Sequence, residues 1–137
     1  MRILLTGSNN RNDYLTVVRA ISVAIDRLVS EDSEDKNIII VHGAGRGVES
    51  LVTEFVNKSE DILRGWGITI EEEKHYPDWE RFEGKARAIN NTKMVALGAD
   101  ICVAFPSESS KHVWDCIVKA RRAGITVLTY KEEDADS

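Results

Sequence analysis

The apolar residues of this sequence form short continuous runs that alternate with longer segments of helical spacing. The short runs cover residues 2–6, 38–41, 68–73, 101–105 and 126–130, and their composition favours strands. Between them, apolar residues recur every three or four positions over about residues 13–28, 46–64, 82–97 and 111–123, which is typical of amphipathic helices. Asp13 is a suitable N-cap for the first helix, and Gly98 and Gly124 are typical stops for the last two. The pattern therefore predicts five strands and four helices in alternation.

Alternation of this kind is typical of a parallel sheet with right-handed crossovers and helices on both faces. We expect a Rossmann-like three-layer α/β sandwich over residues 1–130, as a single domain, followed by a frayed acidic tail at 131–137. In such sheets, ligands bind beyond the carboxyl ends of the strands, where the strand order reverses. Three loops should meet at that edge, at residues 7–12, 42–47 and 106–111.

The loop at residues 42–47 is rich in glycine and reads HGAGRG between a predicted strand and a predicted helix. Glycines let the chain turn sharply and let its amides approach a ligand closely. The first-turn amides of the following helix have no partner within the helix, and the helix dipole is positive there, so phosphate is the expected ligand. The glycines do not complete GxGxxG, because Val48 stands at the last glycine position, and GxxxxGK[ST] is absent. An NAD dehydrogenase or an ATPase is therefore not favoured.

Composition narrows the class of protein. The chain has 137 residues, of which 42% are hydrophobic and 30% charged, enough for the core of one globular domain. A formal net charge of -5 argues against sequence-independent binding to nucleic acid. Cys102 and Cys116 have no spacing typical of a disulfide framework or a zinc site, which fits a reducing cytoplasm. No stretch is apolar enough to span a membrane, and we expect a soluble protein with no metal or cofactor.

Several short motifs recur in an order that resembles a known family. They are Thr6-Gly7-Ser8, the VHGAGRGVE stretch at 41–49, Asp78-Trp79, Gly84-Lys85-Ala86, Asn91, Met94, Phe105-Pro106, Trp114-Asp115-Cys116 and Ala123-Gly124-Ile125. Over residues 4–130 the chain resembles the YspA/YpsA-related family of the SLOG superfamily. That Rossmann-like group also contains the LONELY GUY phosphoribohydrolases and the DNA-processing DprA proteins. The resemblance implies a nucleotide-derived ligand, with its phosphate on the glycine loops and its ribose or base near the strand at 101–105, and a homodimer through helix faces.

The chain also departs from the pattern of that family. The family carries GSR where this chain has Gly7-Ser8-Asn9, an arginine where it has Asn90, and a PGGxGT-like loop where it has residues 106–113. In the phosphoribohydrolases an arginine on the third helix and a glutamate just beyond that loop are needed for cleavage, and Asn90 and Cys116 are their nearest counterparts here. Neither stabilises an oxocarbenium-like centre as a carboxylate does. The resemblance therefore favours binding or sensing over hydrolysis.

The candidate ligand-binding residues lie in the three loops and on the third helix. They are Gly7, Ser8, Asn9, His42, Gly43, Gly45, Arg46, Gly47, Glu49, Asn90, Asn91, Pro106, Ser107, Ser110 and Lys111. Arg46 is the favoured phosphate ligand, because it lies between two glycines at a helix start. The catalytic candidates are Glu49 and Asp115.

Most of these residues also have a purely structural interpretation. Glu49 either accepts hydrogen bonds from ribose hydroxyls or simply complements the helix dipole. His42 at a strand end is more typical of a structural histidine than of a catalyst. Trp79 and Trp114 either stack on a base or pack in the core. Ser8 and Ser110 are also common turn residues.

Three hypotheses follow from the sequence. The first is a protein that binds or senses a nucleotide-derived small molecule. The second is a LOG-like nucleoside 5'-monophosphate phosphoribohydrolase with a diverged active site. The third is a DprA-like nucleic-acid or protein-interaction module, which the acidic net charge disfavours.

Overall fold

The computed structural model describes residues 1–131, and residues 132–137 of the predicted acidic tail lie outside this described part. The strands are β1 (Arg2–Gly7), β2 (Asn37–His42), β3 (Thr69–Lys74), β4 (Ile101–Phe105) and β5 (Val127–Thr129). The helices are α1 (Tyr14–Leu28), α2 (Val48–Gly65), α3 (Trp79–Phe82), the 3-10 turn η1 (Glu83–Lys85), α4 (Ala86–Ala96) and α5 (Lys111–Arg122). The predicted alternation of strands and helices is confirmed.

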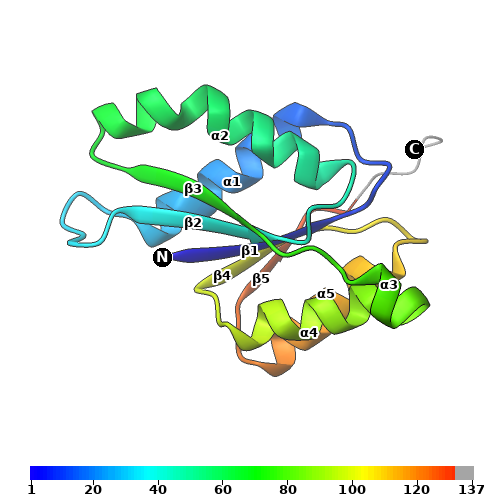
Figure 1. The fold of residues 1–137 in the computed structure, drawn as a ribbon. Helices are drawn as coiled ribbons and strands as arrows, with labels where there is room; N and C mark the ends of the chain where they lie inside the picture. The colour runs from blue at the N-terminus through cyan, green and yellow to red at the C-terminus, as the bar shows by residue number, and fades with distance from the viewer. Residues whose placement is uncertain (132–137) are drawn as a thin grey trace.

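The five strands form one parallel sheet in the order β3-β2-β1-β4-β5. Helices α1 and α2 cover one face, and α4 and α5 cover the other (Figure 1). The prediction of a Rossmann-like α/β sandwich is therefore confirmed. The chain first builds outward from β1 to β3 and then crosses to β4 on the other side of β1, so the strand order reverses beside β1.

Strand β1 is buried on both faces, which explains its uninterrupted apolar run. Its side chains alternate across the sheet: Ile3 and Leu5 join the apolar cluster under α1 and α2, while Leu4 joins the cluster under α4 and α5. All three are at most 1% exposed. A central strand of a parallel sheet needs apolar residues at every position for this reason.

The predicted helix at 82–97 is wrong in its first turn, because the chain is interrupted there. Glu83 has φ +47°, in the left-handed region, which ends α3 after one turn. Asp78 caps that turn separately, since its carboxylate accepts a hydrogen bond from the Arg81 amide at 3.1 Å. The main helix, α4, starts at Ala86. Helix α2 likewise starts at Val48 rather than Arg46, because Gly47 has φ +68°.

Two glycines bring the loop after β1 into backbone contact with the start of α2. A Cβ on Gly7 would lie 2.4 Å from Cβ of Val48. A Cβ on Gly47 would lie 2.5 Å from the carbonyl oxygen of Ser8 and 2.6 Å from that of Asn9. No L side chain fits at either position without a shift of the backbone. The glycines therefore hold the first two loops against each other.

Replacing Gly7 with alanine should destabilise the fold by about 1–3 kcal/mol, because the added methyl group overlaps Val48 and forces α2 away from β1. Gly65→Ala is the matched control, since a Cβ there meets no atom within 4 Å. The control should change the free energy of unfolding by no more than about 1 kcal/mol, in the stabilising direction. Urea denaturation measures both. Equal stabilities of the two variants would contradict the contact described here.

Candidate functional site

The loops after β1, β2 and β4 meet at the carboxyl edge of the sheet, as predicted. The Ser8 amide donates to the carbonyl oxygen of Phe105 at 3.0 Å, which joins the first loop to the end of β4. Nε2 of His112, on α5, lies 3.2 Å from the carbonyl oxygen of Gly7. Together with the packing of Gly47 on the first loop, these contacts gather three segments that are distant in the sequence.

A small, partly open cavity lies at this edge. Its walls come from β1, the glycine loop, the start of α2, the chain before α3, and helices α4 and α5: Leu5, Thr6, Gly43, Glu49, Pro77, Arg87, Asn90, Asn91, Met94 and His112. It leaves about 10 Å³ for the centre of a water molecule, which is room for roughly one water. Any larger molecule bound here lies mainly outside the cavity.

Glu49, the second residue of α2, is the acidic group of this cavity. It is 3% exposed, and its Oε2 has no hydrogen-bond partner among the described residues. Burial raises the pKa of Glu49 to about 7, although the backbone amides of Glu49 and Gly7 and the charge of Arg87 act in the opposite direction. A buried oxygen without a partner is costly, so this atom is suited to accept a hydrogen bond from a bound molecule.

Arg87, in the first turn of α4, is the cationic group beside Glu49. Its Nη2 donates to Oδ1 of Asn9 at 3.4 Å, and both terminal nitrogens lie 3.4 Å from the place of a Cβ on Gly45. The guanidinium therefore faces the first and second loops. Arg87 is not among the site residues predicted from the sequence. Its position three residues before Asn90 could have indicated this role, because residues three apart lie on the same face of a helix.

Asn90, Asn91 and His112 also line the cavity. Nδ2 of Asn90 donates to the carbonyl oxygen of His75 at 2.6 Å. Nδ2 of Asn91 donates to the carbonyl oxygen of His112 at 2.9 Å, so the two asparagines hold neighbouring segments in place. Burial, followed by the charge of Arg87, lowers the pKa of His112. His112 is thus a neutral donor to Gly7, a role the sequence did not suggest.

Other predicted site residues have their polar groups engaged elsewhere. His42 has both ring nitrogens occupied: Nδ1 accepts from the Ala44 amide at 3.0 Å, and Nε2 donates to Glu72 at 2.7 Å. Oγ of Ser110 accepts from the amide of Ser107 and donates to its carbonyl oxygen, which closes the third loop as a turn.

Asp115, the second catalytic candidate, is held in an ion pair. Its carboxylate accepts from Lys119 at 2.8 Å and from Asn91 at 3.0 Å, and it does not line the cavity. Nε1 of Trp114 donates to the carbonyl oxygen of Ser107. Arg46 and Lys111 are exposed on the second loop and at the start of α5. Ser8 and Pro106, in the first and third loops, are buried.

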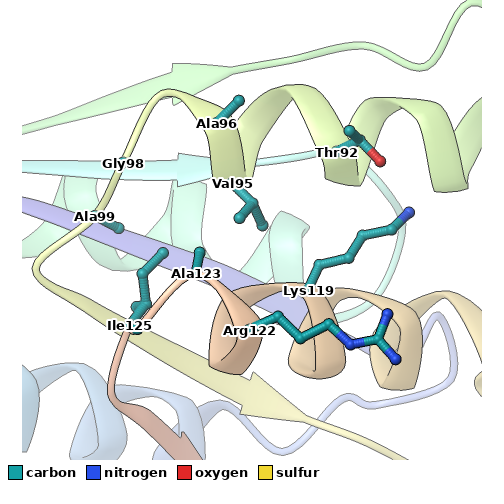
Figure 2. A pocket seen from close by; sticks show the side chains of 10 residues that line it. Thr92, Val95, Ala96, Gly98, Ala99, Lys119, Arg122, Ala123 and Ile125 are labelled. Carbon is teal, nitrogen blue, oxygen red and sulfur yellow. The ribbon is translucent and has the colours of Figure 1, made fainter.

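A larger, open cavity of about 710 Å³ lies at the opposite edge of the sheet, between the ends of α4 and α5 (Figure 2). Small and apolar side chains such as Val95, Ala99 and Ile125 form most of its wall. Arg122 and Lys119 lie at one end, and Lys119 is already paired with Asp115. None of the residues that line this cavity carries a carboxyl group, so the smaller cavity at the carboxyl edge is the candidate site.

Neither a metal-binding cluster nor a helix that could cross a membrane is found in the described part of the chain. Within residues 1–131, no cluster of three His, Cys, Asp or Glu side chains could hold a metal ion. None of the helices in this range is long and apolar enough to cross a membrane.

The fold and this cavity define a Rossmann-like α/β protein with a buried acidic side chain at the carboxyl edge of its sheet. The chain is 31% identical over 132 residues to the Gene 61 protein of Mycobacterium phage D29. The aligned stretch covers 96% of this chain and 98% of the phage protein. It belongs to the same family as that phage protein. No protein-family model matches the sequence.

Replacing Glu49 with glutamine should flatten the pH dependence of stability. The folded pKa of about 7 exceeds the ordinary value of 4.5, so the folded state keeps a proton that the unfolded chain releases, and stability falls as pH rises through this window. The difference between the two pKa values corresponds to roughly 3 kcal/mol in the free energy of unfolding. In urea unfolding, the stability of Glu49→Gln relative to wild type should rise by roughly 2–3 kcal/mol from about pH 5 to 8.

The histidines are present in both proteins, so their contributions cancel in this difference. Stability curves that run parallel across the window would show that Glu49 keeps its ordinary pKa.

Proposed function

We propose that the protein binds or senses a nucleotide-derived small molecule at the carboxyl edge of the sheet. The observation that carries the proposal is the pair formed by Glu49 and Arg87. Within residues 1–131, a buried carboxyl oxygen that has no hydrogen-bond partner and a guanidinium line one cavity where the strand order reverses. Open α/β sheets bind ligands at such points. The resemblance to the SLOG superfamily supports the same class of ligand.

The two groups suit two different parts of a nucleotide. Glu49 accepts a hydrogen bond from a ligand hydroxyl, such as one of the ribose, in the space that holds roughly one water. Arg87 binds the anionic group outside the cavity, near Asn9 and Gly45. Arg46 and Lys111 are exposed at the same edge and add positive charge to a chain whose net charge is -5.

The start of α2 supports the anionic half of this arrangement. Gly47, its N-cap, makes no side-chain hydrogen bond to the first turn. Glu49 is the acidic side chain in the first turn, so the positive end of this 18-residue helix is available to an anion when Glu49 is protonated.

Binding should depend on the half-buried Arg87 more than on the exposed Arg46 and Lys111. Arg87→Leu removes charge-assisted hydrogen bonds to the anionic group and should weaken binding by about 10- to 100-fold. Isothermal titration with nucleoside mono- and diphosphates measures this, after a thermal-shift panel has identified those that raise the melting temperature. Arg122→Leu, which changes the cavity at the other edge, is the matched control and should bind as wild type does.

A panel in which no nucleotide raises the melting temperature of the wild-type protein would overturn the proposed function. Equal loss of affinity in both arginine variants would place the ligand elsewhere or indicate a nonspecific charge effect.

Hydrolysis of a nucleoside 5'-monophosphate is the second candidate function, and Glu49 is the observation that favours it. Where the phosphoribohydrolases carry a glutamate just beyond the third loop, this chain has the fully buried Cys116, and Glu49 on α2 is the carboxyl group that lines the cavity. In this reaction the bond from C1' to the base nitrogen breaks, the oxygen of water bonds to C1', and the base leaves with a proton. With a pKa of about 7, Glu49 is available in both protonation states for acid–base work or for stabilising the cationic centre.

If this candidate is correct, chromatography will detect free base after incubation of a nucleoside monophosphate with the protein at neutral pH. Glu49→Gln should then lower the rate by about 100-fold or more, because glutamine neither transfers a proton nor carries the negative charge. Glu108→Gln, an exposed position in the third loop, is the control. Absence of base release from every nucleoside monophosphate would remove hydrolysis while leaving binding intact.

A further inference from the structure

Trp79 is an aromatic residue that core packing does not explain. It opens α3, a four-residue helix without a single buried side chain, and it is 51% exposed. Asp78 fixes this turn in place by capping it, and Pro77, two residues before Trp79, lines the cavity. The indole is thus held near the cavity by local structure and remains open to solvent.

Arg87 connects this indole to the candidate site. Its guanidinium carbon lies 5.7 Å from the centre of the Trp79 ring, within the range of a cation–π contact. The same guanidinium reaches Asn9 and approaches Gly45. One side chain therefore touches the aromatic surface, both loops and the cavity.

The other two tryptophans lack this placement. Trp66 is 76% exposed but follows α2 at the amino edge of the sheet, where β3 begins. Trp114 is half-buried, and its ring nitrogen donates to Ser107. Exposure together with a cationic link to the cavity distinguishes Trp79.

We propose that Trp79 determines the specificity of the site by stacking on the aromatic base of the ligand, while Arg87 binds the adjoining anionic group. This inference rests on the proposed function and narrows it, because a site with an aromatic platform selects nucleotides over sugar phosphates. Bases stack on aromatic side chains with little dependence on sequence, since every base has a π-face.

The test compares adenosine 5'-monophosphate, uridine 5'-monophosphate and ribose 5-phosphate by isothermal titration. Wild type should bind at least one of the nucleotides about 10-fold or more tightly than the sugar phosphate. Trp79→Ala should bring this ratio close to one while leaving the affinity for ribose 5-phosphate unchanged. Trp66→Ala, an equally drastic change at an exposed indole, should keep the wild-type ratio. Circular dichroism verifies that both variants are folded.

The possible outcomes bear differently on the role of Trp79 and on the proposed function. Retention of the wild-type ratio in Trp79→Ala overturns the role of Trp79 and leaves nucleotide binding in place. Equal affinity of wild type for ribose 5-phosphate and the nucleotides overturns base stacking and keeps a phosphate site. Failure of all three compounds to bind overturns both proposals.

Discussion

The contact between the loop after β1 and the first turn of α2 is the constraint on which the site depends. Val48 occupies the space in which Gly7 would carry a side chain, and Gly47 lies against two carbonyl oxygens of the first loop. This contact presses the start of α2 against the carboxyl end of β1. The next residue, Glu49, is consequently almost fully buried, and its raised pKa follows from that burial. The chemistry of the carboxyl group therefore depends on two residues that have no side chain.

The sequence was sufficient to predict the architecture because the strongest signals were local and repeated. The run at 38–41 is apolar at every position, and Asp13 does cap α1 by accepting from the Thr16 amide. The edge at which three loops meet followed from topology alone. The break at Glu83 could not be predicted, because glutamate is a good helix former. Its left-handed φ occurs because α3 ends before Glu83 and α4 begins separately at Ala86.

The site was less predictable because its contacts join distant segments. Glu49 was a candidate from the sequence, but its burial depends on the packing of two loops. Arg87 was missed because the expected arginine was sought at Asn90, although one helical turn leads to the same face. His112 meets Gly7 across 105 positions of the sequence, which no local pattern signals. Asp115 has the right chemistry for catalysis, yet an ion pair with Lys119 occupies it.

In the proposed complex, the charges of the site also fix the direction of the ligand. An anionic group placed beside Glu49 would be repelled whenever that carboxyl is ionised, and near its pKa of about 7 a substantial fraction is. The anion therefore belongs on the side of Arg87 that faces Asn9, and a hydroxyl belongs inside the cavity. A nucleotide bound in this direction raises the pKa of Glu49 further, because the added negative charge favours the protonated form. Binding would then couple to proton uptake near neutral pH, so the same residue that orients the ligand also makes its affinity sensitive to pH.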